Sequence, residues 1–284
     1  MSEPTSPGPA SSSPDERAAS RRGADDRRSS ERRDRRELGP PVVEFTNIWK
    51  AFDDNSIYEG LDLTIHKGET LTIVGGSGTG KSVLLKCLLR LIVPDQGTIR
   101  AFGEEVTGRT EPEMIAIRSR IGMLFQGAAL FDSLSVADNI AYPLRQQNWG
   151  DEDRIRDRVA EVLEMVNLPG LERKWPAELS GGMKKRIGLA RAIAIEPEVI
   201  LYDEPTTGLD PTNVKRIDEL IVDMQRRLGV TSIVVTHDMD SAFRVSDRLA
   251  MLYGKKIVWC GHKDEVESAD NPVVQDFISG NIGD

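Results

Sequence analysis

The stretch that decides the fold runs from residue 71 to residue 82 and reads LTIV followed by GGSGTGKS. The first four residues form a short apolar run typical of a buried strand. The next eight match G-x-x-x-x-G-K-[ST], the pattern of a phosphate-binding loop, and a helical pattern over Ser82–Leu91 follows. Strand, loop and helix in this order are the context in which the pattern binds nucleotide phosphates. The sequence therefore predicts a nucleotide-binding α/β domain.

The phosphate-binding loop combines groups that suit a nucleotide with its Mg²⁺. Lys81 is expected to reach the β- and γ-phosphates, and the hydroxyl of Ser82 to ligate Mg²⁺. The N-terminus of the following helix adds its dipole. Backbone N–H groups expected to cradle the phosphates belong to Gly75, Gly76, Ser77, Gly78, Thr79 and Gly80.

Residues 199–204, which read VILYDE, supply the second half of the predicted site. An apolar strand that ends in an acid would place Asp203 beside the Mg²⁺. The adjoining Glu204 can then polarise an attacking water as general base.

A second anion-binding element is predicted at residues 179–183, which read LSGGM. Ser180 is a favourable N-cap for the helix that follows, and a helix N-terminus attracts anions. Because the chain already has a phosphate-binding loop, this element suggests a symmetric pair in which each protomer serves the partner's nucleotide.

The rest of the chain from residue 41 alternates short strands with helices, which indicates a parallel sheet covered on both faces. Between residues 127 and 178 the strand pattern stops and helices dominate, which predicts an inserted helical subdomain. Strands are expected at 42–45, 61–65, 70–74, 121–125, 199–202, 232–235, 249–253 and 257–259, and helices at 82–91, 152–166, 180–195, 213–228 and 239–245.

The composition is that of a globular protein with an unusual first segment. Hydrophobic residues make up 39% and charged residues 29% of the chain, which excludes collagen-like and wholly disordered classes. Residues 1–40 contain no Val, Ile, Phe, Tyr or Trp, so they cannot bury enough apolar surface to offset the entropy of ordering. We expect a disordered tail over 1–40 and one folded domain over 41–284.

Charge and cysteine content limit the partners. A net charge of −9 argues against a protein that binds nucleic-acid phosphates. The apolar runs are far shorter than the roughly 20 residues of a membrane-spanning helix. Cys87 and Cys260 have no metal-ligand spacing, which favours a reducing compartment.

Six motifs occur in the order found in the ATPase subunits of ABC transporters, which the sequence resembles over about residues 41–275. The resemblance implies an α/β fold with a RecA-like P-loop NTPase core, an antiparallel β portion and an inserted helical subdomain. It also implies Mg²⁺-dependent hydrolysis of ATP to ADP and phosphate. The motifs are Lys81, Gln126, the segment 179–183, the pair Asp203–Glu204, the turn Gly208–Asp210, and His237.

The resemblance implies further roles within one protomer. Phe52 would stack on the adenine ring, although Phe45 and Tyr58 are nearby alternatives. Gln126 would sense Mg²⁺ and the γ-phosphate, and His237 would hydrogen-bond the γ-phosphate as a catalytic switch.

Other residues would act across a dimer. Ser180, Gly181 and Gly182 would contact the γ-phosphate bound to the opposite protomer, and Asp210 would communicate between the two sites. Met183 departs from the commonest signature, which has Gln there. Because the phosphate contacts come from Ser180 and backbone N–H groups, this departure should not abolish function.

Segments 126–136, 178–186, 256–259 and 271–277 resemble more narrowly the ATPases of Mla/Mce-type phospholipid transporters. This implies a homodimer on the cytoplasmic face of the inner (plasma) membrane, with an integral-membrane permease and with Mce-type lipid-binding and small accessory subunits. The alternatives are an importer for a small polar solute, a soluble ABC protein acting on DNA or ribosomes, and an inactive nucleotide-binding regulator. An intact Glu204 and His237 argue against the regulator.

Two segments have alternative interpretations. Leu130 and Phe131 either fill the core of the helical subdomain or line a groove for a permease helix. The cations Lys184, Lys185 and Arg186 open a helix against the dipole preference, which favours a solvated or acid-paired face.

Overall fold

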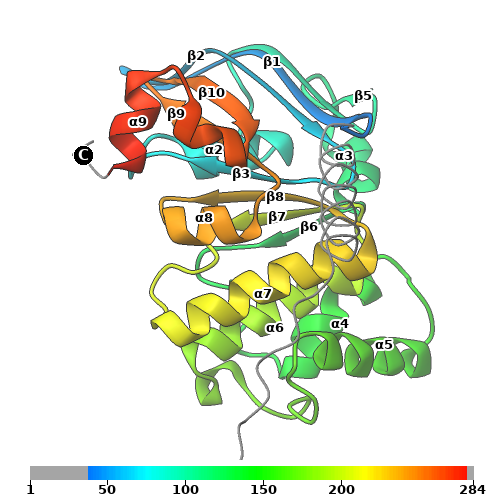
Figure 1. The fold of residues 1–284 in the computed structure, drawn as a ribbon. Coiled ribbons are helices and arrows are strands. Elements are labelled where there is room, and N and C mark those ends of the chain that lie inside the picture. The colour runs from blue at the N-terminus through cyan, green and yellow to red at the C-terminus, as the bar shows by residue number, and fades with distance from the viewer. Residues whose placement is uncertain (1–37, 280–284) are drawn as a thin grey trace, which may run out of the picture. The chain divides into compact units, whose positions relative to one another are not determined.

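The computed structural model describes residues 38–279 (Figure 1). The chain divides into two compact units, Met1–Leu38 and Gly39–Asp284, and the elements described here all belong to the second. The predicted tail over 1–40 lies almost entirely outside the described residues. None of the helices in the described part combines the length and apolar character that a membrane span requires.

A six-stranded sheet forms the centre of the domain, in the order β10-β9-β3-β8-β7-β6. All neighbouring strands are parallel except β10, which pairs antiparallel with β9. Every residue of β3, β7 and β8 is buried, as expected for a parallel sheet covered on both faces. The strands are β3 (Thr70–Val74), β6 (Ile121–Leu124), β7 (Val199–Asp203), β8 (Thr231–Thr236), β9 (Arg248–Tyr253) and β10 (Lys256–His262).

A second, antiparallel sheet has the order β2-β1-β4-β5. Its strands are β1 (Pro41–Phe52), β2 (Asn55–His66), β4 (Gln96–Ala101) and β5 (Glu104–Glu105). The predicted strands at 42–45 and 61–65 are short parts of β1 and β2, and β4 and β5 were not predicted. β4 buries only Ile99 and Ala101, so its sequence carries little alternation and its pairing with β1 defines it.

Helices pack against the central sheet, and Figure 1 shows α4, α5, α6 and α7 grouped on one side of β6, β7 and β8. Between residues 127 and 178 the described structure has helices and no strand, while the boundaries of a helical subdomain stay a prediction. α3, α4 and α9 were not predicted individually. The helices are α2 (Lys81–Leu88), α3 (Glu111–Arg118), α4 (Val136–Gln146), α5 (Glu152–Met165), α6 (Gly181–Ala194), α7 (Pro211–Leu228), α8 (Met239–Val245) and α9 (Pro272–Ile278), with 3-10 turns at Pro176–Glu178 and Lys263–Ser268.

Two large apolar clusters fix the site between them. One joins the antiparallel sheet to β3, α2 and α3, and contains the fully buried Tyr58 and Cys87. The other joins α4, α5, α6 and α7 to β7 and β8. β7 and β8 contribute residues to both clusters and β3 contributes to the first, so apolar packing anchors the strands from which the loops of the site leave.

Candidate nucleotide-binding site

Three adjacent strands end at one edge of the central sheet. β3 ends at Val74, β8 at Thr236 and β7 at Asp203, in the spatial order β3-β8-β7. The phosphate-binding loop, His237 and Glu204 follow these ends directly. In open parallel sheets the carboxyl ends of the strands form the ligand-binding edge, so the topology brings together three segments that are distant in sequence.

The phosphate-binding loop has a backbone that requires glycine. Gly78 and Gly80 have φ of +75° and +100°, a region that side chains rarely adopt. A Cβ on Gly80 would also lie 2.5 Å from Ile57 Cγ2. The carbonyl oxygen of Gly80 accepts a hydrogen bond of 2.6 Å from the buried Tyr58 hydroxyl. Sequence reasoning offered Tyr58 as an adenine contact, but its hydroxyl supports the loop instead.

Lys81 lies under the loop with its ammonium group almost enclosed. Its Nζ donates hydrogen bonds of 2.8 Å to the carbonyl oxygens of Gly75 and Gly76 and lies 3.8 Å from Glu204 Oε1. Burial lowers the pKa of Lys81, while Glu204 and Asp203 act in the opposite direction. The ammonium group is thus positioned at the centre of the loop, beside the carboxylate of Glu204, the candidate general base.

Ser82 and Asp203 provide a donor set that fits Mg²⁺. The Ser82 hydroxyl donates to Asp203 Oδ1 at 2.5 Å, so a hydroxyl and a carboxylate converge from α2 and β7. Among residues 38–279 no cluster of three or more His, Cys, Asp or Glu side chains could hold a metal alone. This suits Mg²⁺, which binds one or two carboxylates and completes its shell with waters and substrate phosphates.

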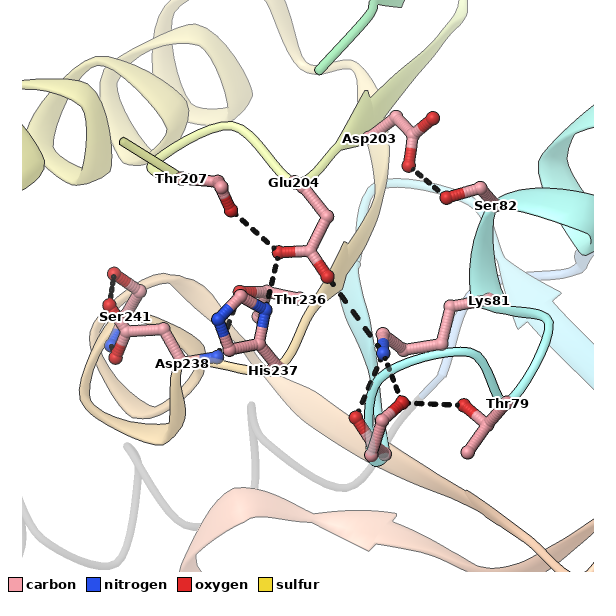
Figure 2. A network of polar contacts seen from close by, with 12 residues as sticks. Thr79, Lys81, Ser82, Asp203, Glu204, Thr207, Thr236, His237, Asp238 and Ser241 are labelled. Atoms are coloured by element: carbon pink, nitrogen blue, oxygen red, sulfur yellow. Dashed lines mark hydrogen bonds and ion pairs between the residues drawn. The ribbon is translucent and has the colours of Figure 1, made fainter. Parts of the chain in front are cut away.

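Glu204 lies between Lys81 and His237 (Figure 2). Its Oε2 accepts a hydrogen bond of 3.0 Å from the Thr207 hydroxyl and lies 2.9 Å from His237 Nδ1. Its carboxylate is largely buried, whereas the imidazole is more than half exposed. The arrangement holds a carboxylate at the strand edge with one exposed imidazole beside it, which is suitable for orienting a water.

Phe52 and Gln126 lie outside this polar network. Phe52 ends β1, its side chain is exposed, and Lys50 Nζ lies 5.2 Å from the ring centroid. Gln126 is exposed and follows the end of β6 by two residues. Both side chains are accessible at strand ends, and their adenine and γ-phosphate roles stay predictions.

The segment 180–182 lies beside Asn213, which bonds to Asp210, and not beside the phosphate-binding loop. Ser180 is the N-cap of α6, where its hydroxyl accepts from Met183 N at 3.3 Å. A Cβ on Gly182 would lie 2.7 Å from Asn213 Oδ1, and Asn213 in turn bonds to Asp210, the N-cap of α7. In the described chain no hydrogen bond joins residues 180–182 to residues 75–82.

Asp210 and Gly181 stay accessible in this arrangement. Hydrogen bonds from the Asn213 side chain and backbone lower the pKa of Asp210, which is exposed. Ser180 and Gly181 are exposed too. A partner protomer could therefore reach this surface.

At Lys185 the prediction for Lys184–Arg186 fails only in its solvated form, because the acids Asp203 and Glu204 lie near this side chain. This side chain is buried, and its Nζ donates to the carbonyl oxygen of Glu204 at 3.1 Å. The sequence did contain a signal, because Lys185 precedes Gly188 and Leu189 by three and four residues and so shares the buried face of α6.

Leu130 and Phe131 divide between the two interpretations offered for them. Leu130 packs half-buried against the helical cluster. Phe131 is 44% exposed, and its ring centroid lies 5.0 Å from that of Tyr142. Phe131 and Tyr142 line a surface depression of about 470 Å³ with Met123, Phe125, Arg191 and Ile195.

Arg191 was not singled out from the sequence, although it holds this segment. Its guanidinium donates to the carbonyl oxygens of Ala128 and Ala129 at 2.8 and 2.7 Å. Both alanines have positive φ. Arg191 thereby connects α6 to the segment after Gln126.

Known proteins share this architecture. The sequence profile of the ABC transporter family matches residues 58–207. The probable ribonucleotide transport ATP-binding protein mkl of Mycobacterium bovis is 42% identical over 84% of this chain and 66% of its own length. The chain thus spans just under two thirds of that relative.

Two further similarities extend the comparison. The chloroplastic protein TRIGALACTOSYLDIACYLGLYCEROL 3 of Arabidopsis thaliana is 40% identical over 85% of this chain and 74% of its own length. The ATP-binding cassette MJ0796, solved as a dimer in a post-hydrolysis state with ADP and Pi, superposes with a TM-score of 0.72. It is 29% identical and covers 78% of this chain and 98% of its own.

Proposed function

Since this chain belongs to the ABC transporter family of ATP-hydrolysing domains, we propose that it powers the transport of phospholipid or a related lipid through a separate membrane permease. The observation that carries the ATPase part is the position of the Glu204 carboxylate, between Lys81 and His237 and next to the Ser82–Asp203 pair. It supplies a base, a cation and a metal-ligand pair at one sheet edge.

Each group has a defined task in this proposal. The backbone of residues 75–80 and the Lys81 ammonium bind the β- and γ-phosphates of ATP, and Phe52 stacks on the adenine. Glu204 orients and deprotonates the attacking water, with His237 at the γ-phosphate. Ser82 and Asp203, with Gln126 as a further ligand, would hold Mg²⁺, which would neutralise phosphate charge when bound.

A head-to-tail homodimer completes the site in this proposal. Ser180 and Gly181 face solvent, whereas Gly182 is buried against Asn213, which bonds to Asp210. Residues 180–182 would reach the γ-phosphate bound to the partner. The dimeric state of the similar cassette MJ0796 supports this assembly. Closure and reopening of the pair would then pass motion to the permease.

The permease would dock at the depression beside Phe131. Its exposed Phe131 lies five residues after Gln126, so one segment would both sense the nucleotide and contact the partner. Such docking places the chain peripherally on the cytoplasmic face of the inner (plasma) membrane. We further propose Mce-type lipid-binding and small accessory subunits, and no nucleic-acid partner.

The lipid cargo is supported by the four Mla/Mce-like segments and by the lipid in the name of the Arabidopsis relative. The name of the Mycobacterium relative favours a second candidate, a small polar solute such as a ribonucleotide. Purifying the protein with its native membrane partners and identifying the bound molecules by mass spectrometry distinguishes the two. Bound phospholipid supports the proposal, and a bound polar solute without lipid contradicts it.

Replacement of Glu204 by Gln tests the ATPase assignment. A neutral amide leaves the phosphate loop intact but cannot accept a proton, so kcat should fall by about 10²- to 10⁴-fold. ATP should still bind, as measured with a fluorescent ATP analogue, and an ATP-bound dimer should accumulate. Turnover close to wild type in this variant would remove Glu204 from the catalytic role.

A further inference from the structure

Glu204 has a backbone conformation that residues other than glycine rarely adopt. Its φ is +47°, and Pro205 follows. The residue before a proline is normally extended, and a strained backbone of this kind persists only where surrounding contacts hold it. The orientation of this carboxylate therefore depends on specific partners of the Glu204 peptide.

Besides the contacts of its carboxylate with Lys81 and His237, contacts from three elements hold Glu204. Its N–H donates to Val235 O on β8 at 3.0 Å, and its carboxylate accepts from the Thr207 hydroxyl. Its carbonyl oxygen accepts from Lys185 Nζ at 3.1 Å and from the Thr207 N–H at 3.4 Å. The Val235 contact comes from the central sheet and the Thr207 contacts come from the adjoining turn. The Lys185 contact comes from α6, the helix that Ser180 caps.

Lys185 makes this contact at an energetic cost. Its side chain is 5% exposed, and a buried ammonium group is unfavourable unless it is paired. Burial lowers the pKa of Lys185, while Asp203 and Glu204 raise it. The neighbouring Leu189 is apolar and fully buried, so an apolar side chain would suit the packing of this face. The hydrogen bond to the Glu204 carbonyl and the nearby charges of Asp203 and Glu204 account for a lysine here.

Ser180 and Lys185 lie on consecutive turns of one helix. A displacement of the first turn of α6 therefore moves the Lys185 ammonium relative to the Glu204 carbonyl. Figure 2 shows that this peptide joins the strand end carrying Asp203 to the carboxylate facing Lys81 and His237.

We propose that Lys185 is a positioning residue that fixes the Glu204 peptide from α6, so that contact of Ser180 with the partner's nucleotide sets the general base of its own protomer. The inference rests on the proposed ATPase function and head-to-tail dimer. It adds a physical connection between the two ATP sites that passes through one buried side chain.

Replacement of Lys185 by Met tests the connection, because Met keeps an apolar stem and removes the donor. We expect kcat to fall at least tenfold, with KM for ATP changed less than threefold, and the Hill coefficient for ATP to approach one. Lys185→Gln, which keeps an amide donor, should recover part of the rate. The matched control is Lys184→Met on the same helix, which removes the same charge from a half-buried side chain and should behave as wild type.

The outcomes separate this inference from the proposed function. If the wild-type protein hydrolyses ATP no faster than Glu204→Gln, the proposed function fails. If the wild type is active and Lys185→Met retains its kcat and Hill coefficient, only the inference fails. If Lys185→Met lowers the melting temperature so far that its kinetics cannot be interpreted, the Lys185→Gln variant tests the inference instead. A folded Gln variant with a reduced kcat and a lowered Hill coefficient supports the positioning role, and one with the wild-type kcat and Hill coefficient overturns it.

Discussion

Arg158 offers a direct test of how the helical part of the domain is attached to α6. This side chain of α5 is 5% exposed. Its Nε donates to Ala194 O and its Nη2 to Ile193 O, each at 3.0 Å. Both carbonyls belong to the last turn of α6, where helical carbonyls lack intrahelical partners. Replacement of Arg158 by Met keeps the apolar stem and removes these donors.

The size of the effect follows from what each carbonyl retains. Ile193 O also accepts from Glu196 N at 3.1 Å, so it keeps one partner. Ala194 O loses the hydrogen bond from Arg158. A buried carbonyl left unpaired costs about 1–3 kcal/mol, and a hydrogen bond from a charged donor contributes a similar amount. Because Met does not bury a charge, part of this loss is offset. We therefore expect the free energy of unfolding to fall by about 3 kcal/mol in total.

A thermal melt followed by circular dichroism measures this loss. For a domain of this size, about 3 kcal/mol corresponds to a fall in Tm of roughly 6–12 °C. The control is Arg156→Met on the same helix, where the side chain is 74% exposed and pairs with Asp153. Exposed ion pairs contribute about 1 kcal/mol or less. Equal melting of the two variants would refute the role of Arg158.

Three further predictions test other parts of the structure. Ser180→Arg and Lys81→Ala should each be inactive, yet a verified heterodimer of the two should regain activity at one site, and no recovery would contradict a shared site. Phe131→Asp should leave folding and ATP binding unchanged but weaken copurification with the permease, because a charge is poorly solvated in an apolar socket; loss of folding would instead assign Phe131 to the core. Tyr58→Phe should lower the free energy of unfolding by about 1 kcal/mol and raise KM for ATP, whereas Tyr253→Phe, with an exposed side chain, should change neither.

Local patterns in the sequence were sufficient to predict the elements of the site. The strand over 70–74 is β3 with the same bounds, and the α/β fold with an antiparallel portion is confirmed. These predictions succeed because a phosphate-binding loop requires glycines, a lysine and a hydroxyl at fixed spacing. β4 was missed because its pairing with β1, rather than its own alternation, defines it.

The sequence by itself therefore determined that Lys81, Ser82, Asp203 and Glu204 could carry the chemistry. It did so because the short-range spacing within each motif fixes the residue type at each of these positions. Tertiary structure alone decided which of them meet. The order β3-β8-β7 places residues 33 positions apart, Glu204 and His237, within 2.9 Å. It also buries Lys185 against the Glu204 peptide. Such contacts depend on strand order and helix packing, which involve long-range burial that no local pattern records.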